Sequence, residues 1–480
     1  MIRRLCGALL ALLCARVAAA QAPASAPTAT TWSLRDWTRV EMWRFYEPPP
    51  GGGNNDYAFT ANRLFAGVQR TAPALDLTAA LQYVQFEALP PDAVGPGPLG
   101  TGAVYYAHAG RSDSHQVYLR YAHVRVKRVI PHTTIQVGRM PYASGNEATS
   151  GNPKIETVRQ QRVFARVIGE FGWSIYQRAF DGVRADTVRG RWSATGFAFH
   201  PTQGGFEDAA GLMMPGVTVL GAAATVNSIG AARPVQSQVF AYRYRDTRRV
   251  TQRPDNTGRS AAAADVGINT FGVTVIAAPP ARRGRQWDAL LWAAFQTGSW
   301  YEQTHRAASI AVEAGRQWSE EPWQPWLRGG YLYASGDGNP SDNRHGTFFE
   351  MLPTVRQYSQ SALYSQMNDT DLFAQLLARP RANVNVRLDW HRVGLASSRD
   401  GWYYGSGATQ QHGSIFGFAT RPSFGSTHLA TIEEGSIDYA VGPHWSISGY
   451  LAVGRGGGVV RPAFAGRTLT FAFIENVVQF

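Results

Sequence analysis

The feature that most restricts the fold is a two-residue alternation of apolar and polar side chains that recurs along most of the chain. Its clearest instance, residues 382–392, has two sets of alternate positions: apolar Val384, Val386, Leu388 and Trp390, and polar Asn383, Asn385, Arg387, Asp389 and His391. Successive side chains of a β-strand point to opposite faces, so the pattern predicts a strand with one apolar and one charged face. Turn-forming clusters at 48–55, 90–100 and 253–258 separate such segments.

A second alternating segment, 239–246, places three aromatic residues opposite two arginines, namely Phe240, Tyr242 and Tyr244 opposite Arg243 and Arg245. We expect its aromatic face to point outward and its arginines inward. Residues 77–83, 118–127 and 270–275 alternate more weakly. In 118–127, Tyr118 falls with the apolar set and Arg120 interrupts it.

The N-terminus has the order of a secretory signal peptide: Arg3 and Arg4, an apolar run over 5–15, and three alanines ending at Ala20. We therefore expect a signal peptide over 1–20, a short N-terminal segment over 21–34 and one domain over 35–480. Both cysteines lie in the signal peptide, so the mature chain is expected to form no disulfide and no thiolate metal site.

After residue 20 no apolar run reaches the 18 or so residues of a spanning helix. An exported chain of recurring strands is instead typical of a β-barrel of the bacterial outer membrane, where closure satisfies every backbone group in lipid. The length suits about 16 to 18 strands. The last residues, TFAFIENVVQF, resemble the terminal assembly signal of such barrels; the alternative is the closing strand of a secreted sandwich.

The formal charge is +12, or +9 once Arg3, Arg4 and Arg16 are removed with the signal peptide, and it comes almost wholly from arginine. The planar guanidinium binds carboxylate or phosphate at two points, which favours an anionic partner. A high genomic GC content would also enrich arginine, so charge alone does not decide between the two explanations.

The stretch 331–348, YLYASGDGNPSDNRHGTF, changes abruptly from alternating aromatics to turn formers. A strand entering a loop explains it. The alternative is a calcium loop starting at Asp337, but an EF-hand requires Gly at its sixth position and Glu at its twelfth, which are Asp342 and Phe348 here. We expect no metal site and no cofactor.

Residues 333–354 resemble the signature of the alginate export family, in which a strand ends in Ser-Gly-Asp, Asn-Pro follows, and Thr-Phe with a later Leu-Pro closes the loop. The matching residues are Ser335, Gly336, Asp337, Asn339, Pro340, Thr347, Phe348, Leu352 and Pro353. Segments 137–147 and 178–186 are also similar. The resemblance covers 35–480 in order, departs at Met140 and is poor over 200–235.

This resemblance implies a monomeric all-β, antiparallel outer-membrane barrel of about 18 strands with an arginine-lined lumen through which a polyuronate leaves the cell. It also implies that the loop after Ser335 folds over or into the pore mouth, where it gates or shapes the pore. The expected partners are an anionic polysaccharide or oligosaccharide, outer-membrane lipid and the outer-membrane assembly machinery. Nucleic acid and catalytic residues are not expected.

By parity or position in a matching motif, the candidates for the lumen pathway are Arg39, Glu41, Arg63, Arg125, Arg139, Asp181, Arg184, Arg243, Arg245, Arg387, Asp389, His391 and Glu434. At each position an interior ion pair competes with polymer contact as the explanation. We expect His391 to be a hydrogen-bonding wall residue. Glu433 and Glu434 are adjacent, so only one of them can face inward.

Three other functions remain open. A barrel does not encode direction, so an anion-selective porin for uptake of acidic oligosaccharides or organic acids fits equally. An outer-membrane hydrolase could use Ser335, Asp337 or His345, but no G-x-S-x-G elbow is present. A barrel closed by its own loops would have a structural role alone.

Overall fold

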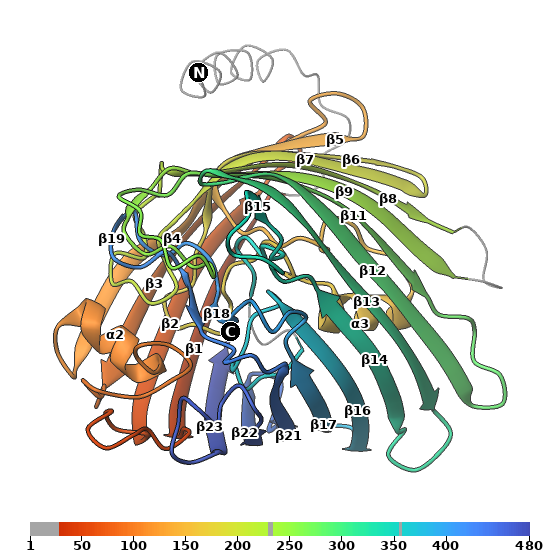
Figure 1. Cartoon of the computed structure of the whole chain (residues 1–480). Coiled ribbons are helices and arrows are strands. Elements are labelled where there is room, and N and C mark those ends of the chain that lie inside the picture. The colour runs from red at the N-terminus through yellow and green to blue at the C-terminus, as the bar shows by residue number, and fades with distance from the viewer. Residues whose placement is uncertain (1–27, 229–233, 355–357) are drawn as a thin grey trace.

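The computed structural model describes residues 28–228, 234–354 and 358–480, and the expected signal peptide lies outside the described residues. Eighteen antiparallel strands close into a barrel (Figure 1), which confirms the predicted fold class. The first nine are β1 (Ala29–Arg44), β2 (Asp56–Thr71), β3 (Leu75–Glu87), β4 (Ser114–Lys127), β5 (Thr133–Met140), β6 (Phe180–Arg189), β7 (Trp192–Pro201), β8 (Val217–Asn227) and β9 (Val235–Asp246). The others are β11 (Val266–Ala277), β12 (Arg285–Trp300), β13 (Gln303–Trp318), β14 (Trp326–Ala334), β16 (Asp369–Arg381), β17 (Val384–Gly394), β21 (His428–Ala440), β22 (Trp445–Gly456) and β23 (Thr468–Gln479).

The barrel closes between its first and last strands. β1 pairs with β23, with Arg39 opposite Glu475, and the backbones of Leu34 and Phe480 exchange hydrogen bonds of 3.0 and 2.8 Å. The aromatic C-terminus is therefore part of the seam. β1 begins at Ala29, so it includes residues 29–34, which we expected to precede the barrel.

Connections differ sharply between the two ends of the barrel. One end has turns such as 72–74, 190–191 and 382–383, and the other has long connections. The long connections include 88–113, 141–179, 202–216, 247–265, 335–368 and 395–427. Both ends of the described chain lie at the short-turn end, because the start of β1 pairs with the end of β2.

The long connections carry the remaining elements: α2 (Thr101–Ala109), α3 (Pro153–Arg162), β10 (Arg249–Val250), β15 (Arg344–His345), β18 (Trp402–Gly405), β19 (His412–Gly413) and β20 (Phe418–Arg421). In the described part of the chain, neither helix has the length or apolarity needed to cross a membrane.

Two long connections run through the barrel interior (Figure 1), and we call residues 141–179 inner loop A and the described residues 335–354 and 358–368 inner loop B. They are joined by backbone hydrogen bonds: Leu352 N to Val167 O (3.0 Å) and Gly169 N to Leu352 O (2.7 Å). A third bond, from Thr354 N to Ala165 O, is 3.0 Å long. Because these bonds satisfy backbone groups away from the wall, the two loops form a single plug.

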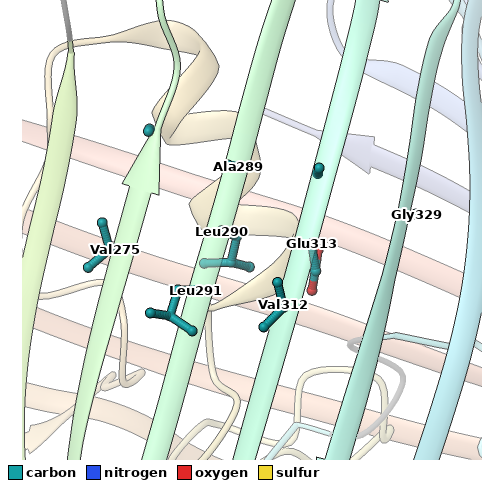
Figure 2. A pocket seen from close by; sticks show the side chains of 9 residues that line it. Val275, Ala289, Leu290, Leu291, Val312, Glu313 and Gly329 are labelled. Carbon is teal, nitrogen blue, oxygen red and sulfur yellow. The ribbon is translucent and has the colours of Figure 1, made fainter.

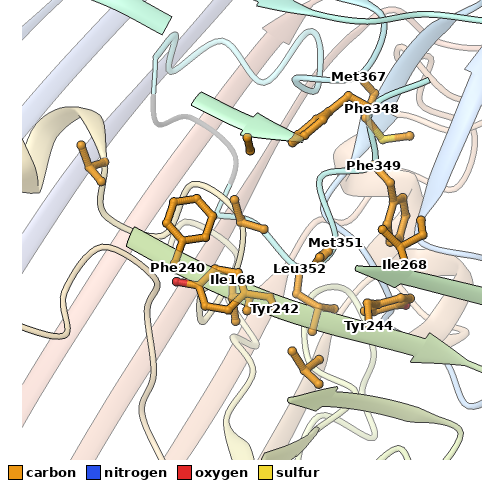
Figure 3. Close-up of a cluster of buried hydrophobic side chains, with 14 of the residues drawn as sticks. Ile168, Phe240, Tyr242, Tyr244, Ile268, Phe348, Phe349, Met351, Leu352 and Met367 are labelled. Atoms are coloured by element: carbon orange, nitrogen blue, oxygen red, sulfur yellow. The ribbon is translucent and has the colours of Figure 1, made fainter. Parts of the chain in front are cut away.

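The plug packs on an aromatic inner wall, which reverses the orientation expected for β9. Phe240, Tyr242 and Tyr244 point inward and are buried, in one cluster with Phe349 and Leu352 of inner loop B (Figure 3). On the same strand, the arginines expected to face inward lie on the outer face. The inner face of β9 is therefore aromatic and packs closely on the plug.

On β17 the expected orientation is observed. Leu388 is 52% exposed and Trp390 37%, whereas Asp389 and His391 are buried at 6% and 1%. Apolar side chains thus face the lipid and charged ones the interior, as the alternation predicted.

The irregular alternation in 118–127 results from a β-bulge in β4. The register with β3 shifts between Ala80 and Leu81, which are opposite Tyr121 and Leu119, so Arg120 is the extra residue. A bulge changes the parity of all that follows. Tyr118, expected on the apolar outer face, therefore points inward, where its hydroxyl donates to the carbonyl of Tyr176 in inner loop A.

Candidate functional site

The densest charged group inside the barrel, which we call the buried cation cluster, consists of Lys154, Arg162, Arg166, Arg328, Asp288 and Glu313. Glu313 lies 2.9 Å from Arg162, 3.2 Å from Arg328 and 3.8 Å from Arg166. Asp288 lies 3.2 Å from Arg328 and 3.6 Å from Lys154. All six side chains are at most 7% exposed.

Local sequence explains how plug and wall meet in this cluster. Asn152 caps α3 by accepting from the backbone amides of Lys154 and Ile155, and Pro153 starts the helix, so Lys154 and Arg162 project from a fixed turn. Opposite them, the wall needs small residues. A Cβ on Gly315 would lie 2.7 Å from Asp288 Oδ2.

The cluster contains more positive than negative charge. Four cations face two carboxylates, a formal charge of +2. A third carboxyl, Glu350, interacts electrostatically with Arg166, but burial raises the pKa of Glu350 to about 8, so it is mostly neutral at pH 7. Within the described residues, both Nη atoms of Arg162 and Nη1 of Arg166 donate no hydrogen bond. Such donors can donate to a carboxylate at two points.

A second group lies towards the short-turn end. Arg39 donates to Glu475 (2.6 Å) and to Glu41 (2.9 Å). The ring of Trp37 is sandwiched between two guanidinium groups, those of Arg39 at 4.4 Å and Arg63 at 4.6 Å. Arg63 is buried and donates to a plug carbonyl, Ser174 O, at 2.9 Å.

This group borders a cavity of about 590 Å³ at the short-turn end, between the wall and the plug. Its lining includes Arg35, Arg63 and Arg120 together with a single carboxylate, Glu170, which pairs with Arg120. The C-terminal residue, Phe480, also lines it. The cavity is therefore basic and reaches the end of the barrel that carries the short turns.

A third group joins β16, β17 and β21. Arg387 pairs with Asp389 and donates to the carbonyl of Tyr358 in inner loop B at 2.6 Å. Glu434, 6% exposed, accepts from Tyr450 Oη (2.7 Å), and Asp371 lies 2.9 Å from His391 Nδ1. Glu433 is exposed on the outer face, so of the two adjacent glutamates Glu434 is the inward one.

The remaining pathway candidates divide between the two faces. Arg184 faces inward and binds Asp186 at 2.8 Å, and Arg125 shares the inward face of β4 but is exposed. Arg139 and Asp181 pair at 2.7 Å on the face opposite to the buried Met140 and Phe180. The pair was expected to line the interior, but it does not. The motifs in 137–147 and 178–186 singled out these residues without indicating which face of the strand they occupy.

Arg243 and Arg245 are the second correction. Arg243 donates to Asn269 at 2.9 Å, and Arg245, 45% exposed, lies 3.0 Å from Asp265 on the outer face. Their placement follows from the aromatic side of β9, which has more apolar area to bury against the plug.

Sequence reasoning missed most of the buried cation cluster. Lys154, Arg162 and Arg166 belong to inner loop A, where no strand period exists to reveal their direction. Asp288, Glu313 and Arg328 lie on strands whose other inward residues are mostly apolar or small, so parity suggested no charged face. Arg120 did give a signal, since it broke the alternation.

The loop motif anchors inner loop B. Ser335 N and O bond to Ala308 O and Phe348 N at 2.9 and 2.8 Å, and a Cβ on Gly336 would lie 1.9 Å from Asn368 Oδ1. The amide of Asp337 donates to Asp400, and burial raises the pKa of Asp400 to about 6. In the segment considered as a calcium loop, the carboxylate of Asp337 accepts a hydrogen bond from the backbone amide of Asn339 at 3.0 Å. Such a bond is typical of a turn, which agrees with a strand entering a loop.

One apolar hollow lies outside the interior (Figure 2). Val275, Leu291, Val312 and Gly329, from β11 to β14, border it, and Leu291 and Val312 are exposed on the outer face. In a membrane this notch faces lipid, so it is no part of a polar pathway.

The sequence model described as Alginate export matches residues 51–445. The chain belongs to the alginate export family. No curated protein matches it. This family comprises outer-membrane transport channels, so the predicted location, the bacterial outer membrane, is confirmed.

Solved structures agree on the fold. Pseudomonas aeruginosa OccK9 (OpdG) is similar with a TM-score of 0.58 and 11% identity, over 94% of this chain and 98% of that one. Acinetobacter baumannii OccAB4 gives 0.59 and 8%, and P. aeruginosa OccK2 (OpdF), crystallised in complex with glucuronate, gives 0.57 and 7%, with the same coverage. Identities this low show a shared barrel.

Proposed function

We propose that the barrel exports an anionic polysaccharide, a polyuronate of the alginate type, through its interior, and that it carries out no catalysis. Such a polymer has a carboxylate on each sugar. It would enter at the basic cavity of the short-turn end, which faces the periplasm in barrels of this kind. It would then pass the buried cation cluster.

The single observation that carries this proposal is the excess of buried positive charge. Four cations and two carboxylates share a site in which three guanidinium nitrogens of Arg162 and Arg166 donate no hydrogen bond within the described residues. Unpaired donors of this kind are costly unless an anion meets them. Several weak contacts of this type, one after another, bind a polymer and still release it.

Inner loops A and B fill the interior, so passage requires the plug to move. We propose that inner loop B, held by Ser335, Gly336 and Asp400, is the gate. The plug's apolar contact with β9 and its polar contact with β17 would then form the two sides of the gate.

Conductance in planar bilayers tests the proposal. We expect an anion-selective channel that polyuronate blocks from the short-turn side. In the double variant Arg162→Gln, Arg328→Gln we expect the blocking concentration to rise about tenfold or more, since each charged hydrogen bond contributes about 1.5–3 kcal/mol. The matched control is Arg243→Gln, an arginine on the outer face. Heat-modifiable migration in gels verifies that each variant folds.

A cation-selective channel, or an anion-selective one that polyuronate does not block, would contradict the proposal. Absence of conductance even after deletion of residues 336–350 would favour the closed, structural barrel.

Uptake of small acidic sugars is the second candidate, supported by the crystallisation of OccK2, a similar barrel, in complex with glucuronate. It predicts a block by monomeric uronates at concentrations similar to those for the polymer. Export of a polymer predicts that block strengthens steeply with chain length, because each added sugar contacts another cation. A series of uronate oligomers of increasing length separates the two.

A further inference from the structure

We propose that Asp389, His391 and Glu434 form a binding site for one divalent transition-metal ion on the inner wall. One potential ligand atom from each lies within 4.8 Å of the others, and all three residues are buried. The register explains this grouping, because Asp389 is directly opposite Glu434 on the neighbouring strand. His391 is two residues further along β17 and so faces the same side.

The imidazole of His391 is oriented as a metal ligand. Its Nδ1 lies 2.9 and 3.0 Å from the two oxygens of Asp371, so Nδ1–H donates to that carboxylate and Nε2 is the nitrogen that would bind a metal. Asp371 is itself held by Tyr364 Oη at 2.9 Å. A carboxylate behind the imidazole in this way fixes the tautomer and raises the basicity of a metal-binding histidine.

Two buried polar atoms of the site have no hydrogen-bond partner among the described residues: His391 Nε2 and Asp389 Oδ1. His391 is 1% exposed, and its Nε2 points towards Glu434 Oε1 at 3.8 Å. An unpaired buried acceptor costs free energy, and two of them beside the carboxylate of Glu434 need a positive partner. A metal ion supplies it for all three groups.

The charge of the group also requires a cation. Asp371, Asp389 and Glu434 contribute three negative charges, and Arg387 contributes one positive charge through its pair with Asp389. With a neutral imidazole the group carries a formal charge of −2, which one divalent ion cancels. Arg387 holds Asp389 through Oδ2, which leaves Oδ1 for the metal.

One imidazole and two carboxylates favour Zn²⁺ or Mn²⁺ over Ca²⁺, which prefers six to eight oxygen ligands. The ion would also fix the plug. Glu434 accepts hydrogen bonds from Ser359 Oγ (2.8 Å) and Gln360 N (3.1 Å), both in inner loop B. Metal binding would therefore tie β17, β21 and inner loop B together.

The experiment is metal binding to the folded, detergent-solubilised protein after chelator treatment and dialysis against Zn²⁺ alone. Elemental analysis is expected to give one tightly held Zn²⁺ per chain, and binding should weaken at least tenfold in His391→Gln and in Asp389→Asn. Glu433→Gln, which removes an exposed carboxylate next to the site, is the control that should retain the metal. Heat-modifiable migration identifies folded protein in each sample.

Competition with Mn²⁺ and Ca²⁺ sharpens the result. Mn²⁺ is expected to give one bound ion by electron paramagnetic resonance, lost in His391→Gln, and Ca²⁺ is expected to displace neither metal. Equal Zn²⁺ binding by the wild type and His391→Gln, no binding above the level of a metal-free blank, or Ca²⁺ bound in preference to Zn²⁺ would each overturn the proposal.

Discussion

Strands β9 and β17 have the same kind of sequence and opposite orientations. Both alternate large apolar residues with charged ones, yet β17 turns Leu388 and Trp390 outward while β9 turns Phe240 and Tyr242 inward. The difference lies in the part of inner loop B that each strand meets. β9 faces the apolar stretch around Leu352, whereas β17 meets a backbone carbonyl of the loop, that of Tyr358, through Arg387.

The comparison shows that alternation in a plugged barrel fixes two faces but not their direction. Lipid accepts an apolar face, and so does an apolar plug, so an aromatic face can be satisfied on either side. The charged face then decides. On β9 it can reach water or other polar groups at the outer rim, whereas on β17 Asp389 finds Arg387 and the plug inside.

The largest effect should come from breaking the polar contact of β17. Arg387→Met leaves Asp389 buried without its cation, and we expect a loss of about 3–5 kcal/mol in the free energy of unfolding. Urea titration of the refolded protein, followed by tryptophan fluorescence, measures it. Arg392→Met, on the outer face of the same strand, should change stability by less than about 1 kcal/mol. Equal losses in the free energy of unfolding for the two substitutions would show that the inward ion pair contributes no more to stability than an arginine on the outer face.

The apolar contact of β9 should be somewhat less sensitive. Leu352→Ala removes a fully buried side chain from the plug, and we expect a loss of about 2–4 kcal/mol in the same titration. Leu388→Ala deletes the same atoms from the lipid-facing side of β17, where little packing is lost, and should cost about 1 kcal/mol or less. If the two costs agree, inner loop B does not pack on β9 in the membrane.

The smallest effect is a pH dependence at Glu350, which lies within the apolar stretch of inner loop B, between Phe349 and Met351. Burial raises its pKa to about 8, so the folded protein binds a proton that the unfolded chain releases near its ordinary value. Stability should therefore fall as pH rises from 5 to 8. Glu350→Gln cannot ionise and should flatten this decline. A slope unchanged by the substitution would exclude Glu350 as its source.

Several residues show how far the sequence alone could go. The alternation of the last strand puts Glu475 and Phe480 on opposite faces, and in the structure Glu475 pairs with Arg39 inside the barrel while the backbone of Phe480 bonds to Leu34 at the seam. Arg162 and Arg166, which carry the proposed function, were not foreseen, because they lie in a loop whose course depends on contacts with strands far away in the sequence.

The sequence by itself determined the strand period and the family, and hence a closed outer-membrane barrel, because only closure satisfies the backbone of alternating strands in lipid. The tertiary structure decided which face of each strand is the inner one and which charges meet. That choice depends on the shape and polarity of the plug, and a period of two is equally compatible with both directions.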